Sequence, residues 1–250
     1  LAPCSPFSVS GDLLRESAKL ARTLGVRLHT HVAETRDEEQ FTLEKFGLRP
    51  IAYMQSLGWT GPDVWYAHGI HFNDDELRIL AETGTGVAHC PASNMKLSSG
   101  VCRVPELLRL DIPVGLAVDG AASNDGSSLL EEMRVCYLLH RLHASAAAPT
   151  GYDVLKLATR GSARLLGRDD IGCLAAGKAA DLFLIDLNRL SLVGAQFDPM
   201  SMLGTVGFKG DVDYTIVNGV PVVQHGELTT IDERETAYEA NRVVARYLGR

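Results

Sequence analysis

Three histidines and one aspartate each end a short apolar run in the first half of the chain: His31, His68, His89 and Asp119. Neutral imidazoles and carboxylates are ligands that Zn²⁺ and Fe²⁺ accept in catalytic sites. A cation held in this way lowers the pKa of its bound water from about 16 to about 7, which supplies hydroxide near neutral pH. Glu34 follows His31 by three residues and could transfer protons beside such a cation. The residue types therefore indicate hydrolytic chemistry.

Each of these residues also has a purely structural interpretation. The His31 to Glu34 stretch could be a buried histidine with a hydrogen-bond partner, followed by a glutamate at a helix start. His68 could be a satisfied core histidine, and Asp119, which precedes a glycine, could simply form a turn. For His89 we favour a place behind the ligands or in the packing over direct ligation.

The elements that must position these side chains alternate regularly. The pattern predicts strands at 26–31, 63–68, 86–90 and 113–119, and helices at 10–24, 36–46, 50–57, 74–82, 105–110 and 128–143. Such alternation means a parallel sheet, either doubly wound or a (β/α)₈ barrel. The carboxyl ends of parallel strands meet at one rim, where chemistry collects. The strand-end histidines and Asp119 are therefore expected at one opening.

Two helix starts carry capping signals. Thr35 is a good N-cap, and Glu38, three residues on, should complete a capping box with it. Asn73 should cap the helix over 74–82, with Glu76 at the N3 position. These signals place each helix directly after a strand that ends in histidine.

The pattern changes after about residue 150. A strand is expected at 181–186, and two more, 214–217 and 220–224, flank an Asn-Gly pair that predicts a hairpin. Pro221 predicts that the second hairpin strand lies at an edge. We expect residues 1–170 to belong to a barrel domain, 171–230 to part of a small β-sandwich, and 231–250 to a C-terminal helix.

Composition excludes several partners. The 250 residues carry a net charge of −7, which argues against a nucleic-acid backbone or an anionic membrane surface. No run of about 18 apolar residues exists to span a membrane. The five cysteines are scattered without a CxxC pair, as expected for reduced thiols in the cytoplasm. No nucleotide-binding glycine motif and no GxSxG elbow is present.

With these residues in place, the chain resembles the amidohydrolase superfamily, and within it the branch of cyclic deaminases and triazine hydrolases. The similar segments occur in order along the chain: 31–35 (HVAET), 66–69 (YAHG), 88–97 (AHCPASNMKL), 118–125 (VDGAASND) and 172–181. The resemblance implies a (β/α)₈ barrel, of which this chain would hold about strands 4 to 8, together with part of a small β-sandwich.

The resemblance also implies roles for individual residues. His31 and Asp119 would ligate one divalent metal, zinc or alternatively iron, and Asp119 would also take a proton from the attacking water. Glu34 would protonate a ring nitrogen. His68 would polarise the water or the substrate, or act as a ligand in two-metal relatives. Metal-bound hydroxide would attack the ring carbon that bears an amine, and ammonia would leave.

Two further residues, His89 and Ser123, would support the ligands from behind. The substrate would be a small purine-like heterocycle, 8-oxoguanine or similar, and the protein would be a cytoplasmic homo-oligomer. The segment 3–7 (PCSPF) lacks the arginine that guanine deaminases have there, which weakens guanine itself as the substrate.

The family's first-strand His-x-His pair is absent from these residues, and two ligands are too few for a stable zinc site. We therefore expect this chain to be a C-terminal portion. Two alternatives stay open: a triazine-type hydrolase that releases an alkylamine, and an inactive barrel fragment that lacks the His-x-His half.

Overall fold

The computed structural model describes residues 1–250, and the chain divides into two compact units. The first unit comprises Leu1–Cys173 and Phe197–Phe208, and the second comprises Leu174–Gln196 and Lys209–Arg250. No helix has the length and apolar character that crossing a membrane requires. The first unit holds a parallel sheet with helices and the second an antiparallel sheet, so the predicted α/β class is confirmed.

The first unit is built from strands that alternate with helices. Its elements are α1 (Gly11–Leu24), β1 (Leu28–Val32), α2 (Arg36–Phe46), α3 (Pro50–Ser56), β2 (Val64–His68), α4 (Asp74–Thr83), β3 (Gly86–His89), α5 (Pro91–Lys96), α6 (Val104–Arg109), β4 (Val114–Leu116), α7 (Ala121–Asn124), α8 (Leu129–Ala144), the 3₁₀ turn η1 (Ser145–Ala147), α9 (Gly151–Lys156), the π-helical turn η2 (Leu157–Gly161), α10 (Ser162–Leu166) and α11 (Met202–Thr205).

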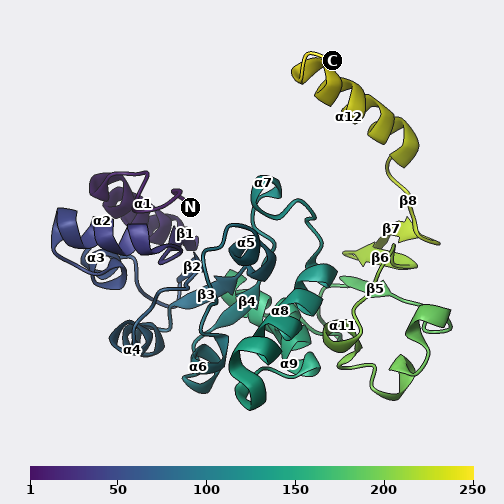
Figure 1. Cartoon of the computed structure of the whole chain (residues 1–250), viewed down its shortest axis with the longest axis horizontal. Helices are drawn as coiled ribbons and strands as arrows, with labels where there is room; N and C mark the ends of the chain where they lie inside the picture. Colours follow the sequence, from purple (N-terminus) through teal and green to yellow (C-terminus); the bar gives the residue numbers. More distant parts are fainter. The chain divides into compact units, whose positions relative to one another are not determined.

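The four strands form one parallel sheet in the order β1-β2-β3-β4 (Figure 1). The register pairs His31 with Ala67 and Val32 with His68, so the two histidines lie near the same end of the sheet. β4 ends at Leu116, earlier than the predicted strand over 113–119, and Asp119 lies three residues beyond it in a loop. The rim is thus built from strand ends and from the loop that follows β4.

The segment before α1 is not a strand, although its backbone contacts β1. The carbonyl oxygens of Leu1 and Cys4 accept hydrogen bonds from the backbone N–H groups of His29 and His31, at 3.0 and 3.1 Å. Alternate residues of β1 are therefore bonded along an edge that would otherwise be unpaired. This contact places the Cys4 carbonyl beside the His31 ring.

Side-chain caps begin the helices and left-handed glycines end them. Ser10 caps α1 and Asn73 forms the predicted capping box with Glu76 at the start of α4. α1, α2 and α4 each end at a glycine with φ between 65° and 70°, a conformation that costs other residues more. The core beneath these helices is apolar, and its largest fully buried side chains include Leu14, Leu28, Ile51, Met54, Trp59, Tyr66, Leu77, Leu80 and Leu107.

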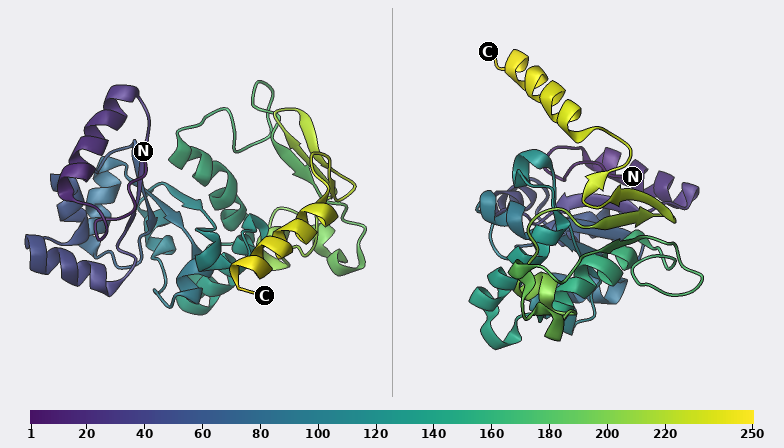
Figure 2. Two further views of the ribbon diagram at one scale, coloured as in Figure 1. Left: turned by 90° about the horizontal axis from the view of Figure 1, so that it is seen from above. Right: turned by 90° about the vertical axis from the view of Figure 1, so that its right-hand side faces the viewer.

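The second unit is an antiparallel sheet with one long helix. Its elements are β5 (Leu182–Leu184), the 3₁₀ turn η3 (Leu190–Leu192), β6 (Tyr214–Val217), β7 (Val220–Gln224), β8 (Glu227–Leu228) and α12 (Glu233–Tyr247), and a further turn, η4 (Ala195–Phe197), spans the boundary in sequence. The strand order is β5-β6-β7-β8. α12 buries none of its residues and extends away from the strands in the right-hand view of Figure 2.

The predicted hairpin is present, but its second strand is not an edge. Asn218 and Gly219 both have positive φ, 48° and 79°, as the tight turn between β6 and β7 requires. β7 pairs with β6 on one side and with β8 on the other, so the prediction from Pro221 was wrong. Pro221 pairs with Ile216 where the β6–β7 register shifts, and such an irregularity is another place where a sheet accepts proline.

Candidate active site

The His31 ring is held by the segment before α1. Its Nδ1 atom lies 2.5 Å from the Cys4 carbonyl oxygen, which can only accept, so Nδ1 carries the proton. The Nε2 atom is therefore left with a free lone pair. A metal-binding histidine usually shows this arrangement, in which the outer ring N–H donates to a carbonyl group.

The His68 ring is held in the same tautomer by a different partner. His68 is 1% exposed, and its Nδ1 atom lies 2.8 Å from Asn94 Oδ1. Its Nε2 atom lies 3.6 Å from Glu34 Oε2. The rings of His31 and His68 stack with their centroids 5.4 Å apart. Two imidazole lone pairs are thus presented side by side.

Asp119 completes the group from the loop after β4. Its Oδ2 atom accepts a hydrogen bond of 2.6 Å from the Ser93 hydroxyl. Partial burial raises the pKa of Asp119, but hydrogen bonds from Ser93 and the Gly120 backbone, with His68 and His31 nearby, outweigh it and leave the pKa below its usual value. Asp119 has φ of 66°, a conformation that a non-glycine residue adopts at some cost. The carboxylate is therefore ionised at neutral pH.

The three side chains fit a divalent cation. One donor atom from each of His31, His68 and Asp119 lies within 4.8 Å of the other two. Two neutral imidazoles and one carboxylate are a known ligand set of catalytic zinc. Because Cys4, Asn94 and Ser93 occupy the outer atoms, the inner donor atoms are the ones available to a metal.

Glu34 stands beside this group on the turn between β1 and α2. Its Oε1 atom accepts a hydrogen bond of 3.3 Å from the Ser99 hydroxyl, while Oε2 faces His68. The side chain is 24% exposed, so it can contact a bound molecule and solvent. Glu34 thus lies beside the three candidate ligands and is partly open to solvent.

Glu38 supports the turn that carries Glu34. Thr35 caps α2 as predicted, but the Glu38 carboxylate does not return to the Thr35 backbone. It accepts instead from the backbone N–H groups of Ala33 and Glu34, at 2.7 and 3.3 Å. The side chain is buried, and burial raises the pKa of Glu38 to about 7 despite these bonds. The predicted capping box is therefore replaced by a bond to the site's own turn.

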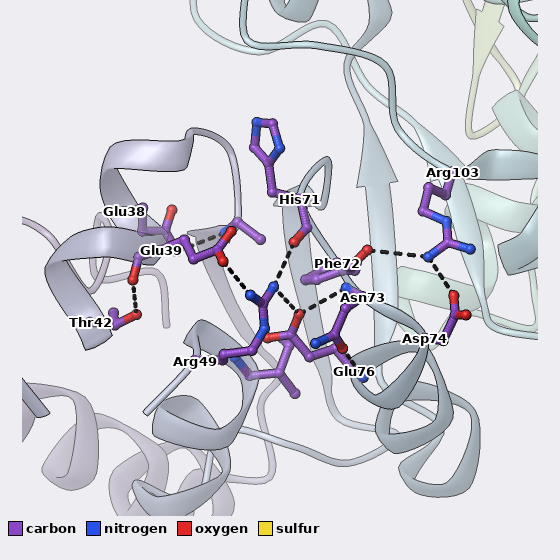
Figure 3. A network of polar contacts seen from close by, with 12 residues as sticks. Glu38, Glu39, Thr42, Arg49, His71, Phe72, Asn73, Asp74, Glu76 and Arg103 are labelled. Carbon is purple, nitrogen blue, oxygen red and sulfur yellow. Dashed lines mark hydrogen bonds and ion pairs between the residues drawn. The ribbon is translucent and has the colours of Figure 1, made fainter. Parts of the chain in front are cut away.

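An ionic network braces the region behind this turn (Figure 3). The Arg49 guanidinium contacts the carboxylates of Glu39 and Glu76 and donates to the His71 carbonyl oxygen at 3.1 Å. Glu76 is 3% exposed and also accepts from the backbone N–H of Asn73. Arg49 thus joins α2, the start of α4 and the segment after β2. The His71 ring in turn lies 3.0 Å from the Ser99 carbonyl oxygen.

The structure shows no hydrogen bond from His89 or Ser123 to the proposed ligands, although His89 lies near His68 on the neighbouring strand. His89 Nε2 lies 3.2 Å from His140 Nε2 on α8, in a buried pair of its own. Ser123 donates its backbone N–H to the Gly120 carbonyl within the turn of α7, and the hydroxyl on Asp119 is that of Ser93. Support from these two residues stays a prediction, and the structure shows other groups in that position.

The sequence alone assigned no supporting role at the site to four residues: Glu38, Ser93, Asn94 and Ser99. Ser93 and Asn94 lie in the segment 88–97 that carried the resemblance, so the signal was present without a role attached. Their partners, Asp119 and His68, are each 26 residues away. No spacing rule links side chains at that separation.

Comparisons of the sequence with known proteins agree on one family. The sequence model described as the amidohydrolase family matches residues 1–222. The 8-oxoguanine deaminase of Pseudomonas aeruginosa is 55% identical over 203 residues, which are 81% of this chain and 45% of that protein. The hydroxydechloroatrazine ethylaminohydrolase of Pseudomonas sp. (strain ADP) is 45% identical over 251 residues, which are 99% of this chain and 52% of that protein.

Solved structures agree with this result. An adenosine deaminase from Xanthomonas campestris with bound zinc is 31% identical, with a TM-score of 0.94 over 98% of this chain and 56% of that one. An atrazine chlorohydrolase from Arthrobacter aurescens, complexed with zinc, is 30% identical, with a TM-score of 0.93 over 98% of this chain and 54% of that one. The chain spans about half the length of the curated relatives it matches.

Proposed function

Because this chain belongs to the amidohydrolase family, we propose that it is the part of a metal-dependent hydrolase that removes an amino group from a purine-like heterocycle such as 8-oxoguanine. One observation carries the proposal. Two imidazoles in the same tautomer and an ionised aspartate converge on one point, with a glutamate beside them. A purely structural role would not require one donor atom from each of His31, His68 and Asp119 to lie close to the other two.

His31, His68 and Asp119 would hold the cation. When bound, a divalent cation acts as a Lewis acid and lowers the pKa of a water molecule on it. Hydrogen bonds to the Cys4 carbonyl, Asn94 and Ser93 hold the three side chains in the orientation that a cation would need. These bonds set which nitrogen of each ring faces inward.

Asp119 would accept a proton from the attacking water. Its Oδ2 atom accepts a hydrogen bond from the Ser93 hydroxyl, which helps to fix the carboxylate plane. The lowered pKa keeps this group ionised at neutral pH, as a proton acceptor must be. His68 donates its Nδ1 proton to Asn94, so its Nε2 atom offers a lone pair.

Glu34 would carry the proton to the heterocycle. Deamination adds water across a ring C=N bond, so the ring nitrogen must gain a proton before the amine can leave. Glu34 is partly exposed, lies next to His68, and is held on its other oxygen by Ser99. It can therefore take a proton from one partner and give it to another without a large movement.

The names of the relatives support an amine-bearing heterocycle as the substrate. They offer two candidates for the leaving group, ammonia and an alkylamine. The Pseudomonas aeruginosa relative is named for 8-oxoguanine deamination and shares 55% identity, whereas the relative named for ethylamine release shares 45%. Both identities exceed those of the adenosine-type deaminases, which lie at 36% to 38%. We therefore favour ammonia release from a purine and keep alkylamine release from a triazine as the second candidate.

The test is an assay of the longest polypeptide that the gene encodes, loaded with Zn²⁺. Ammonia and ethylamine are measured in parallel from 8-oxoguanine, guanine, adenosine and hydroxylated N-ethyl triazines. We expect ammonia from 8-oxoguanine, with a loss of at least about 100-fold in kcat for Glu34→Gln, because one proton transfer contributes about that much. His143→Ala, an exposed histidine on α8, is the matched control and should retain activity.

Ethylamine release that exceeds ammonia release would favour the second candidate. Turnover of any substrate that is indifferent to Glu34→Gln and to His31→Ala would exclude this site as the catalytic centre. An absence of turnover on the whole panel by a zinc-loaded protein would point to the non-catalytic alternative.

A further inference from the structure

A second group of potential metal-binding side chains, which shares no residue with the candidate active site, lies in the core of the first unit. It consists of His89 at the end of β3, and Cys136 and His140 on α8. All three are fully buried, at 0% exposure. One donor atom of each lies within 4.8 Å of the other two. Cys136 and His140 are four residues apart on one helix, so their side chains share a face.

The separation of the two ring nitrogens suits a common ligand. His89 Nε2 and His140 Nε2 lie 3.2 Å apart, with the ring planes tilted by 52°. Two nitrogens bound to one tetrahedral zinc at about 2.0 to 2.1 Å are about 3.3 Å from each other. The pair is therefore spaced as ligands are, without any movement of β3 against α8.

Without a metal, His89 and His140 hydrogen-bond to each other but leave some of their ring nitrogens without a partner. One ring must donate its Nε2 proton to the other, and the accepting ring then carries its proton on Nδ1. The Nδ1 atoms of both rings are buried without a partner. A metal on both Nε2 atoms would replace the hydrogen bond between the rings and would leave the same two Nδ1 atoms unpaired, so these atoms do not distinguish the two states.

Charge in this region also fits a cation that binds one thiolate. Burial lowers the pKa of His89 and lowers that of His140 to about 4, so both rings are neutral and keep a lone pair. Burial, and then the Glu132 carboxylate, raise the pKa of the Cys136 thiol to about 12. Glu132 is 1% exposed. A divalent cation on one thiolate would keep a single positive charge, and Glu132 lies close enough to offset it.

We propose that His89, Cys136 and His140 form a structural binding site for a zinc-class divalent cation. A thiolate and two imidazoles are preferred ligands of this metal class, and burial leaves no path for a substrate. On binding, the Cys136 S–H bond breaks, a sulfur–metal bond forms, and the proton leaves to solvent. The metal would join β3, whose following segment supplies Ser93 and Asn94 to the active site, to the long helix α8.

The test uses cobalt as a spectroscopic probe. The chain is produced in minimal medium supplemented with Co²⁺, so that a buried site can fill during folding, and is purified under reducing conditions. Cobalt bound to a thiolate gives a sulfur-to-metal charge-transfer band in the near ultraviolet, which cobalt on histidine and carboxylate ligands does not give. We expect this band in the unmodified chain, and metal analysis after growth with Zn²⁺ should show zinc retained under mild chelation.

Three variants test whether the charge-transfer band comes from metal bound to Cys136. Cys136→Ser should abolish it, whereas Cys102→Ser should leave it unchanged, because Cys102 is equally buried and near Cys136 but outside the cluster. Asp119→Asn, in the candidate active site, should also leave the band unchanged. The presence or absence of the band in the unmodified chain already tests the proposal. A variant that fails to fold therefore does not end the test.

Either of two results would overturn the proposal. One is a soluble, folded chain that binds cobalt without any sulfur-to-metal band, or that binds none. The other is a band that survives Cys136→Ser or disappears in Cys102→Ser.

Discussion

The Glu38 Oε1 atom accepts a hydrogen bond of 2.7 Å from the backbone N–H of Ala33, the residue directly before Glu34. Ala33 has φ of 54°, in the left-handed region. The second carboxylate oxygen accepts from the backbone of Glu34 itself. A buried glutamate thus holds a strained turn in the conformation that aims Glu34 at His68. Glu38 touches no reacting group, so it acts as a positioning residue.

The stability of the chain should depend on pH through Glu38. Its pKa rises from 4.5 in the unfolded chain to about 7 in the folded one, chiefly by burial. Below the unfolded pKa both states are protonated and there is no penalty. As pH rises from 4.5 to 7 the unfolded state ionises first, so the free energy of unfolding falls by about 3 kcal/mol, and it stays lowered above 7.

Glu38→Gln should remove this part of the pH dependence. Urea unfolding at pH 4.5, 6, 7 and 8 measures it. Glu44→Gln, on the exposed face of α2, is the control and should keep the wild-type slope. The same slope in Glu38→Gln as in the wild type would show that Glu38 ionises freely in the folded protein.

The affinity of the candidate metal centre should depend on Asn94. Asn94 Oδ1 accepts from His68 Nδ1 at 2.8 Å and thereby fixes the ring tautomer. Loss of such an outer partner typically weakens metal binding about 10- to 100-fold. Asn94→Ala should therefore raise the Kd for Zn²⁺ by that factor, measured by competition with a chromophoric chelator. Asn241→Ala, on the exposed helix α12, should not change it. Equal Kd values for the two variants would remove His68 from the ligand set.

Arg49 should be essential for the stability of the first unit. Arg49→Ala leaves the 3% exposed Glu76 carboxylate without its cation, and breaking a buried ion pair in this way costs about 3 kcal/mol. Arg78→Ala removes an exposed pair with Asp75 on the same helix as Glu76, and should change the free energy of unfolding by less than about 0.5 kcal/mol. Urea unfolding of both variants gives the comparison. A similar small effect in both would mean that water replaces the Arg49 guanidinium.

Gly161 should not tolerate a side chain. A Cβ atom at Gly161 would overlap the Val114 carbonyl oxygen, because η2 packs directly on β4. Such overpacking costs about 1 to 3 kcal/mol, so Gly161→Ala should lower the midpoint of thermal unfolding. Gly120→Ala is the control, since its φ of −72° suits alanine and its Cβ position is open. An unchanged midpoint for Gly161→Ala would show that η2 can move away from β4 freely.

The sequence by itself determined the alternation of strands and helices in the first unit and pointed to the residues that we propose for the chemistry. The β1 and β2 histidines, the Asn73 cap and the turn at Asn218 follow from patterns only a few residues long, and the structure confirms each of them. The spacing of apolar residues and the capping of helices depend on backbone geometry within one turn or one strand. For that reason they survive in any fold that contains the segment. The resemblance to amidohydrolases came from the same short stretches and is confirmed by the family comparison.

Only the tertiary structure decided where the side chains point. The sequence could not show that β4 ends before Asp119, that Ser93 rather than Ser123 bonds to it, or that His89 turns toward α8. It predicted that Glu38 would return to Thr35, but the left-handed Ala33 offers its N–H instead. These choices join groups from different elements, and their energies depend on sheet register and on burial. Both quantities exist only once the chain has folded.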